Sequence, residues 1–100
     1  MTGADEGLPQ LRVVRDDERS RYGGRLGDEL VTVVDFHRQG DVVVVTHTGT
    51  EPRWRGRGLA GETTRQVLAD VRASGLRVRA VCSFTADHLD AHPELDDLRA

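Results

Sequence analysis

The stretch Arg55-Gly56-Arg57-Gly58-Leu59-Ala60-Gly61-Glu62-Thr63 decides how this sequence folds. It joins an apolar run at 42–45 to a segment with helical periodicity. Its glycines let backbone N–H groups approach a ligand closely. The helix start adds N–H groups without intrahelical partners and the positive end of the helix dipole. Phosphate is the expected ligand, so the stretch predicts an anion-binding loop between a strand and a helix.

The apolar pattern on both sides of this loop predicts the remaining elements. Five strands are expected, at residues 11–15, 21–26, 29–38, 42–45 and 76–82. Two helices are expected at 59–74 and 85–92, followed by a last turn at 94–98. The 3.6-residue period places one stripe of side chains on the first helix: Leu59, Thr63, Val67, Leu68 and Val71. Gly75 stands where a helix ends in a left-handed residue, and Pro93 stops the second helix.

This order predicts an α/β (α+β) fold with a mixed, mostly antiparallel sheet. The run Val42–Val45 is continuously apolar, which predicts a central strand covered on both faces. The strand–helix–strand unit at 42–82 is expected to be a parallel crossover, and the earlier strands antiparallel. Residues 1–10 are expected to form a flexible tail, and residues 11–100 a single minimal domain.

Composition limits the class of protein. The 100 residues carry 37% hydrophobic and 31% charged side chains with a net charge of −3, which is typical of a globular chain. The sign of the charge disfavours a general nucleic-acid binder. The single cysteine, Cys82, excludes an internal disulfide framework and fits a reducing, cytoplasmic setting. All fourteen basic residues are Arg, which fits a GC-rich bacterial genome.

Two other phosphate-binding patterns overlap the glycine stretch. Gly56, Gly58 and Gly61 match the dinucleotide fingerprint, but Pro52 separates them from the strand, and the next strand ends at Cys82 without an acidic residue for the ribose. The run from Gly56 to Thr63 also approaches a Walker A loop. There Glu62 stands in place of the lysine that reaches the phosphates, so both nucleotide interpretations are disfavoured.

A third pattern is Arg-x-x-Gly-x-Ala at Arg55–Ala60, which resembles the pyrophosphate loop of the GNAT superfamily of N-acetyltransferases. Further residues match the short, single-domain (Yjdj-type) branch in order and spacing: His47-Thr48, Pro52, Gly75, Cys82-Ser83-Phe84 and His92-Pro93-Glu94. The match covers about residues 11–98. It implies a GNAT-like fold with a βαβ unit that binds acetyl-CoA.

The resemblance implies a set of cofactor-binding residues. The backbone of Thr50 would pair with the pantetheine arm, and Arg55, with Arg53 as a further candidate, would meet phosphate. Trp54 would either cover the adenine or serve in packing. The full expected set is Thr50, Arg55, Gly56, Arg57, Gly58, Leu59, Ala60 and Gly61.

Three side chains are the candidates for catalysis of acyl transfer to an amine. His47 is the expected base, because imidazole titrates near neutral pH. Cys82 would protonate the leaving thiolate, or accept the acetyl group first, or serve only in packing. His88 stands where the branch has a tyrosine, and either His88 supplies the acid in its place or the acid is absent. Gly49 replaces the branch's acidic residue, which puts base strength and amine binding in question.

The resemblance implies an acetyl-CoA-dependent N-acetyltransferase with a small-molecule or protein amine as acceptor, using direct attack on the thioester. The alternative is an acyl-CoA-binding regulatory module without turnover. Nucleic-acid binding through Arg53–Arg57 and Trp54 is disfavoured, and no membrane association is expected. His88 and His92 have metal-ligand spacing, but without a third ligand no metal is expected. A monomer or weak homodimer with an open acceptor side is expected.

Overall fold

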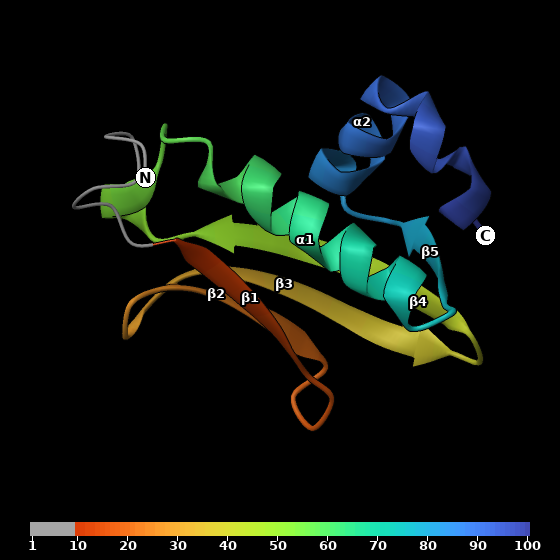
Figure 1. The fold of residues 1–100 in the computed structure, drawn as a ribbon, viewed down its shortest axis with the longest axis horizontal. Coiled ribbons are helices and arrows are strands. Elements are labelled where there is room, and N and C mark those ends of the chain that lie inside the picture. Colours follow the sequence, from red (N-terminus) through yellow and green to blue (C-terminus); the bar gives the residue numbers. More distant parts are fainter. Residues whose placement is uncertain (1–9) are drawn as a thin grey trace, which may run out of the picture.

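A computed structural model describes residues 10–100 (Figure 1). The strands are β1 (Leu11–Asp16), β2 (Arg21–Leu26), β3 (Glu29–Gln39), β4 (Val42–Thr50) and β5 (Arg77–Ala80). The helices are α1 (Leu59–Ala73) and α2 (Ser83–Ala91), with 3₁₀ helices η2 (Pro52–Trp54) and η3 (Pro93–Leu98). The expected tail lies, apart from Gln10, outside the described residues. Neither α1 nor α2 has the length and apolar character that a membrane crossing requires.

The strands form one sheet in the order β1-β2-β3-β4-β5. The first three pairings are antiparallel, and β4 pairs with β5 in parallel. Helix α1 lies between β4 and β5 in the chain, so it makes the connection that a parallel pair requires. This confirms the mixed, mostly antiparallel sheet with a βαβ unit.

Several boundaries differ from the sequence-based expectation: β4 continues to Thr50 beyond the apolar run that ends at Val45, α2 begins at Ser83, and β5 is shorter than 76–82. The last strand ends at Ala80 rather than at Cys82, because the chain leaves the sheet there. The N–H groups of Val81 and Cys82 both donate to the carbonyl oxygen of Val45, at 2.9 and 3.0 Å. Cys82 therefore precedes the first turn of α2, and it does not lie on β5.

Both helices pack against the same face of the sheet, which we call the helix face (Figure 1). One hydrophobic core joins the two layers: Tyr22, Val34, Phe36, Val43, Val45 and Val78 from the strands, and Val67, Leu68, Val71, Leu89 and Leu98 from the helical segments. The predicted stripe of α1 faces this core, except that Leu59 is only half-buried. Gly75 ends α1 with φ +69°, in the left-handed region that was expected.

The opposite face of the sheet, the outer face, is not covered by α1 or α2. Strand alternation and register place on it Arg12, Val14, Asp16, Arg21, Gly23, Arg25, Leu30, Val33, Asp35, His37, Gln39, Val42, Val44, His47, Gly49, Arg77 and Arg79. Val44 is nevertheless buried. Arg79 lies beside it on β5 and donates across β4 to Gln39 Oε1 at 3.0 Å. The run Val42–Val45 is thus covered by helices on one face and by long side chains on the other.

Polar contacts, one of them fully buried, hold α1 in place over the sheet. Tyr22 donates its hydroxyl hydrogen to Asp70 at 2.7 Å, and Arg15 donates to the same carboxylate oxygen at 2.9 Å. Burial and the neighbouring carboxylate raise the pKa of Tyr22, so this phenol stays protonated. These contacts fix the C-terminal half of α1, and the pair Thr32–Thr63 fixes its N-terminal half.

Candidate functional site

The glycine stretch lies between β4 and α1. Strand β4 ends at Thr50, the single turn η2 follows, and α1 begins at Leu59. Gly58 occupies the N-cap position with φ +78°, which a side chain would strain, and no side chain caps the helix. The N–H groups of the first turn therefore have no intrahelical partner. A Cβ added at Gly61 would meet no atom within 4 Å, so the space above this turn is open to a ligand.

A hollow of about 230 Å³ opens at this helix start. Seven of the eight expected cofactor-binding residues line it: Thr50, Arg55, Gly56, Gly58, Leu59, Ala60 and Gly61. Trp54 and Phe84 line it as well. Phe84 was quoted only as part of the motif after Cys82 and had no predicted role. It reaches the hollow because α2 begins at Ser83, beside the end of β4.

The three arginines in and just before the glycine stretch, Arg53, Arg55 and Arg57, have different environments. Arg53 pairs with Glu29, whose Oε2 also accepts from Trp54 Nε1 at 3.0 Å. The hydrogen bond from Arg53 has the largest effect, and together with the one from Trp54 it lowers the pKa of Glu29. Arg55 donates to the carbonyl oxygen of Thr50 at 3.3 Å. Arg57 lies 5.1 Å from the centre of the Trp54 ring.

Neither Arg55 nor Arg57 has a carboxylate within 4.0 Å among residues 10–100, so both guanidinium groups can meet an external anion. Glu29 already compensates the charge of Arg53, so Arg53 is a less favourable phosphate ligand than Arg55 or Arg57.

Strands β4 and β5 separate next to this hollow. Their pairing stops at Val45 and Ala80, and Thr46 forms a bulge opposite β3. A bulge of this kind bends its strand and redirects the residues that follow. Between Thr46 and Thr50, β4 therefore has no strand partner on its β5 side among residues 10–100. An extended ligand could pair with this backbone edge.

Cys82 lies at the point where the strands separate. Its Sγ is 3.6 Å from the hydroxyl oxygen of Thr48 on β4. Burial opposes ionisation of this thiol, but hydrogen bonds from the backbone of Thr85 and from Thr48 outweigh it and lower the pKa of Cys82. The thiol is half-buried, so it is accessible as well as easier to ionise.

His47 lies on the other side of β4. It is exposed on the outer face, and its Nε2 would be 3.2 Å from a Cβ added at Gly49. The imidazole thus leans over the glycine that replaces the branch's acidic residue. Thr48, which contacts Cys82, faces the helices, because it pairs with the core residue Val34. The expected base, His47, therefore lies on the outer face of β4, and the Cys82 thiol lies against the helix face of the same strand.

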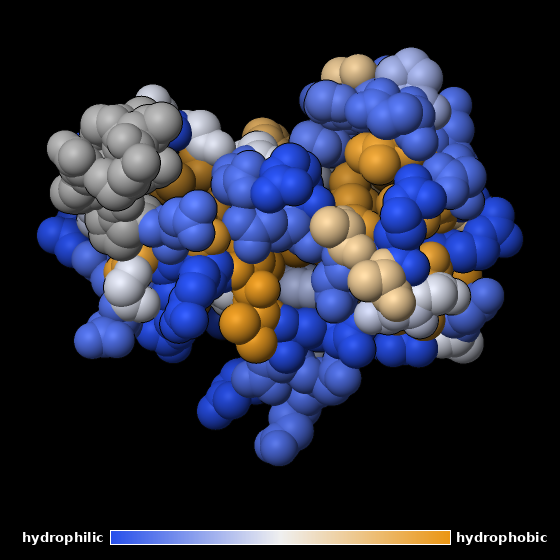
Figure 2. All heavy atoms as spheres, viewed as in Figure 1, coloured by the Kyte–Doolittle hydropathy of each residue, from blue (hydrophilic) through white to orange (hydrophobic). Residues whose placement is uncertain are grey.

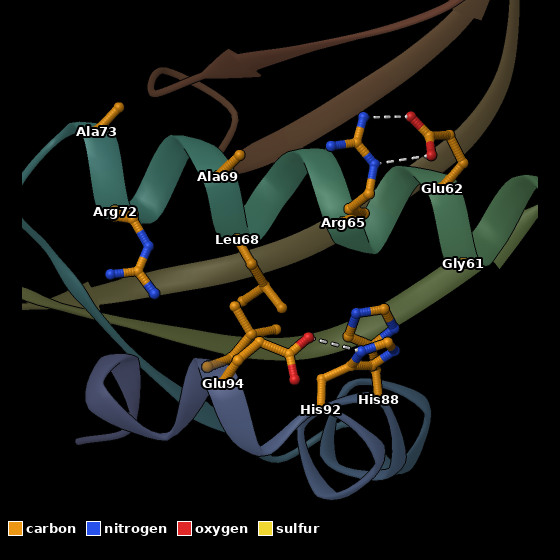
Figure 3. A pocket seen from close by; sticks show the side chains of 11 residues that line it. Gly61, Glu62, Arg65, Leu68, Ala69, Arg72, Ala73, His88, His92 and Glu94 are labelled. Carbon is orange, nitrogen blue, oxygen red and sulfur yellow. Dashed lines mark hydrogen bonds and ion pairs between the residues drawn. The ribbon is translucent and has the colours of Figure 1, made fainter.

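His88 lies in a different hollow, of about 680 Å³, between α1 and the α2–η3 segment. Figure 3 shows His88 and His92 pointing side by side toward α1. Their rings stack with centroids 4.4 Å apart, and His92 Nδ1 is 3.1 Å from Glu94 Oε2. Burial and His92 lower the pKa of His88. Figure 2 shows apolar atoms in this hollow between polar side chains.

The hollow at the start of α1 and the hollow that contains His88 share Gly61, which lines both of them. His88 shares the larger one with residues of α1, whereas Cys82 contacts Thr48. The three expected catalytic residues therefore lie in three surroundings: the outer face, the gap between β4 and α2, and the groove beside α1. Among residues 10–100, no three His, Cys, Asp or Glu side chains form a group that could hold a metal ion.

The chain matches a known family over most of its length. The sequence profile of the GCN5-related N-acetyl-transferases matches residues 21–98. The chain belongs to this family. The matched residues of this N-acetyltransferase family member run from β2 to the end of η3, so they include both hollows and Cys82. No curated protein matches the chain.

A solved structure supports the fold of this family member. The solution structure of a GCN5-like protein from Staphylococcus aureus superimposes with a TM-score of 0.67 and 18% sequence identity. The match covers 90% of this chain and 88% of that one. At this identity the likeness shows the fold, and it confirms the GNAT-like arrangement predicted from the glycine stretch.

Proposed function

We propose that this protein transfers the acetyl group of acetyl-CoA to an amine. The hollow at the start of α1 carries this proposal, since it presents open backbone N–H groups and Arg55, which has no carboxylate within 4.0 Å among residues 10–100, beside the edge of β4 that no described strand pairs with. Phosphate binds well at such helix starts. The pyrophosphate would lie over Gly58–Gly61, and the pantetheine arm would run along Thr50 toward Thr48.

The reaction would be a direct attack on the thioester. The amine nitrogen attacks the carbonyl carbon, the C–N bond forms, the C–S bond breaks, and the amine loses one proton while the CoA thiolate gains one. Cys82 is our candidate for the group nearest the sulfur, because Thr48 and Cys82 line the gap where the strands separate. His47 is our candidate for the base on the amine side of β4.

His88 has a weaker case as the acid. Its lowered pKa leaves the imidazole mostly neutral at pH 7, and its groove lies on the other side of Gly61 from Arg55. If His88 does protonate the thiolate, replacing it with Phe should lower kcat. If it only borders the cofactor, the replacement should raise KM for acetyl-CoA and leave kcat unchanged.

Calorimetry with acetyl-CoA is the first test. Arg55→Gln should weaken binding by about tenfold, as expected for one charge-assisted contact of about 1.4 kcal/mol. Arg38→Gln is the matched control, because Arg38 also donates only to a backbone carbonyl, that of Gly40. If neither variant differs from the wild type, or if acetyl-CoA does not bind, the assigned hollow is wrong.

A binding module without turnover is the second candidate. Gly49 in place of an acidic residue, and the separation of His47 from Cys82, favour it. Release of free CoA thiol with a panel of amines distinguishes the two functions. Thiol release that depends on the amine, and that falls in His47→Gln and Cys82→Ala, supports the enzyme. Tight binding without thiol release supports the module.

A further inference from the structure

The arginines of this protein divide into two groups. Seven form ion pairs with carboxylates: Arg15, Arg19, Arg21, Arg53, Arg65, Arg72 and Arg99. The other seven have no carboxylate within 4.0 Å among residues 10–100: Arg12, Arg25, Arg38, Arg55, Arg57, Arg77 and Arg79. Four of these seven, Arg12, Arg25, Arg77 and Arg79, lie on the outer face. They lie at its two edges, Arg12 and Arg25 on β1 and β2, and Arg77 and Arg79 on β5.

Arg12 and Arg25 are the clearest example of positive charge on the outer face without a nearby carboxylate. They are direct cross-strand partners on β1 and β2, and both side chains are exposed. Like charges placed opposite each other destabilise a sheet. The carboxylates of Asp16 and Asp35 on this face do not reduce the repulsion between the two arginines, since Asp16 pairs with Arg19 and Asp35 pairs with Arg21. In a chain of net charge −3, such a pair fits an anionic partner.

An apolar row lies next to these two arginines. The register runs straight across four strands through Val14, Gly23, Val33 and Gly49. Val14 is 66% exposed on β1, and Leu30 leans over Gly23 from the side, 39% exposed. The row ends on β4 where the His47 ring leans over Gly49. The outer face thus offers apolar contact between a basic end and an imidazole.

The same row leads to the cofactor hollow. A hollow of about 200 Å³ at the start of β3 and the end of β4 is lined by residues that include Leu30, Val33, Gly49 and Thr50. Thr50 also lines the hollow assigned to acetyl-CoA. A chain lying along the row would therefore reach the cofactor from the outer face, on the side where His47 is exposed.

We propose that the outer face, from Arg12 and Arg25 to His47, binds an acidic segment of a protein substrate and presents its amine to the cofactor. This rests on the acetyl transfer proposed above and names the class of acceptor. Carboxylates of the segment would pair with the two arginines, and its apolar side chains would cover Val14 and Leu30. The exposed apolar side chains of this face favour a peptide over nucleic acid, whose recognition depends mainly on its phosphates.

The test uses three labelled peptides of equal length, each with one lysine and two leucines, and with Glu, Gln or Arg at the remaining positions. Fluorescence anisotropy without acetyl-CoA measures binding to the full chain. The acidic peptide should bind most tightly, and its affinity should fall with added salt. In the double variant Arg12→Glu/Arg25→Glu, affinity for it should fall by about tenfold and the basic peptide should gain.

Arg38→Glu is the control, because it makes the same charge change at an arginine outside this surface. Circular dichroism establishes that each variant is folded, and amide chemical shifts on β1–β4 should move when the acidic peptide is added. The proposal is overturned if the acidic and neutral peptides bind equally, if the double variant matches Arg38→Glu, or if a nucleic acid or an anionic vesicle of phosphatidylserine binds more tightly than the acidic peptide.

Two further measurements separate this proposal from the acetyl transfer on which it rests. Calorimetry with acetyl-CoA reports on the cofactor hollow alone. Thiol release with the acidic peptide should show a lower KM than with the neutral peptide. If acetyl-CoA binds but the peptides are not distinguished, the docking surface fails and acetyl transfer stands. If the acidic peptide binds but acetyl-CoA does not, acetyl transfer fails, and so does the assignment of the peptide as acceptor.

Discussion

The hydroxyl oxygens of Thr32 and Thr63 lie 2.7 Å apart in the buried layer between β3 and α1. Thr63 also donates to the carbonyl oxygen of Leu59 at 2.7 Å. Since a hydroxyl has one hydrogen, Thr32 must donate to Thr63. This contact holds the first turn of α1, whose N–H groups form the candidate phosphate site, against the middle of the sheet.

The direction of this hydrogen bond predicts unequal effects of two similar substitutions. Thr63→Val leaves the buried Thr32 hydroxyl without its acceptor and should lower the free energy of unfolding by about 1–3 kcal/mol. Thr32→Val leaves Thr63 bonded to Leu59 and should cost about 0.5–1.5 kcal/mol. Urea unfolding of both variants measures the difference. Equal losses would show that the hydrogen bond does not run in this direction.

Gly24 should not tolerate a side chain. A Cβ added there would lie 2.0 Å from the Thr32 hydroxyl oxygen and 3.3 Å from that of Thr63. Gly24→Ala should therefore displace this pair, lower the free energy of unfolding by about 1–3 kcal/mol and weaken acetyl-CoA binding. Urea unfolding and calorimetry measure the two effects. Val14→Ala on the outer face is the control, and wild-type stability in Gly24→Ala would contradict the expectation.

Gly61→Ala should separate stability from binding. Nothing lies within 4 Å of the added Cβ, and alanine favours a helix over glycine by roughly 0.5–1 kcal/mol. The variant should be at least as stable as the wild type, yet the methyl group would stand where a phosphate approaches, so acetyl-CoA should bind about tenfold more weakly. Calorimetry and thermal unfolding test both. Ala69→Gly, outside this hollow, should lower stability and leave binding unchanged.

The reactivity of Cys82 should depend on Thr48. Thr48 hydrogen bonding is one of the contacts that lower the thiol pKa, so Thr48→Val should raise that pKa and shift the rate of alkylation by iodoacetamide to higher pH. Rates measured from pH 6 to 10 give the midpoint. Thr46→Val on the same strand is the control, because Thr46 bonds to the Asp35 carbonyl instead. A midpoint common to all three proteins would exclude the Thr48 contact.

Acid should weaken the start of α1 through Glu62. Hydrogen bonds from Arg65 and Gln66 lower the pKa of this carboxylate to about 2. A lowered folded pKa contributes stability above the ordinary value of 4.5, and that stability is lost as the pH falls toward 2. Glu62→Gln should cost under about 1 kcal/mol at pH 7, because the pair is exposed. Below pH 2 it should match the wild type; Glu18→Gln makes the same change at an exposed turn residue and is the control.

Local chemistry was enough to predict most elements of this chain. The bounds of β2 match the expected 21–26, and α1 starts at the predicted Leu59. Glycine turns, alternation and the 3.6-residue period depend on neighbours in the sequence, which is why they can be read there. Six residues of the glycine stretch that the resemblance assigns to cofactor binding line the hollow at the helix start, and Thr50 is a seventh member of the expected set that does so.

Sequence alone predicted the anion-binding loop and the order of strands and helices from residues close together in the chain, and it predicted the family from motifs spread over about residues 11–98. Only the tertiary structure decided how His47, Cys82 and His88 lie relative to one another. The bulge at Thr46 sets the faces of β4, and the carbonyl of Val45 turns the chain away before Cys82. The basic outer face is also a tertiary property, since register pairs Arg12 with Arg25 although thirteen positions separate them.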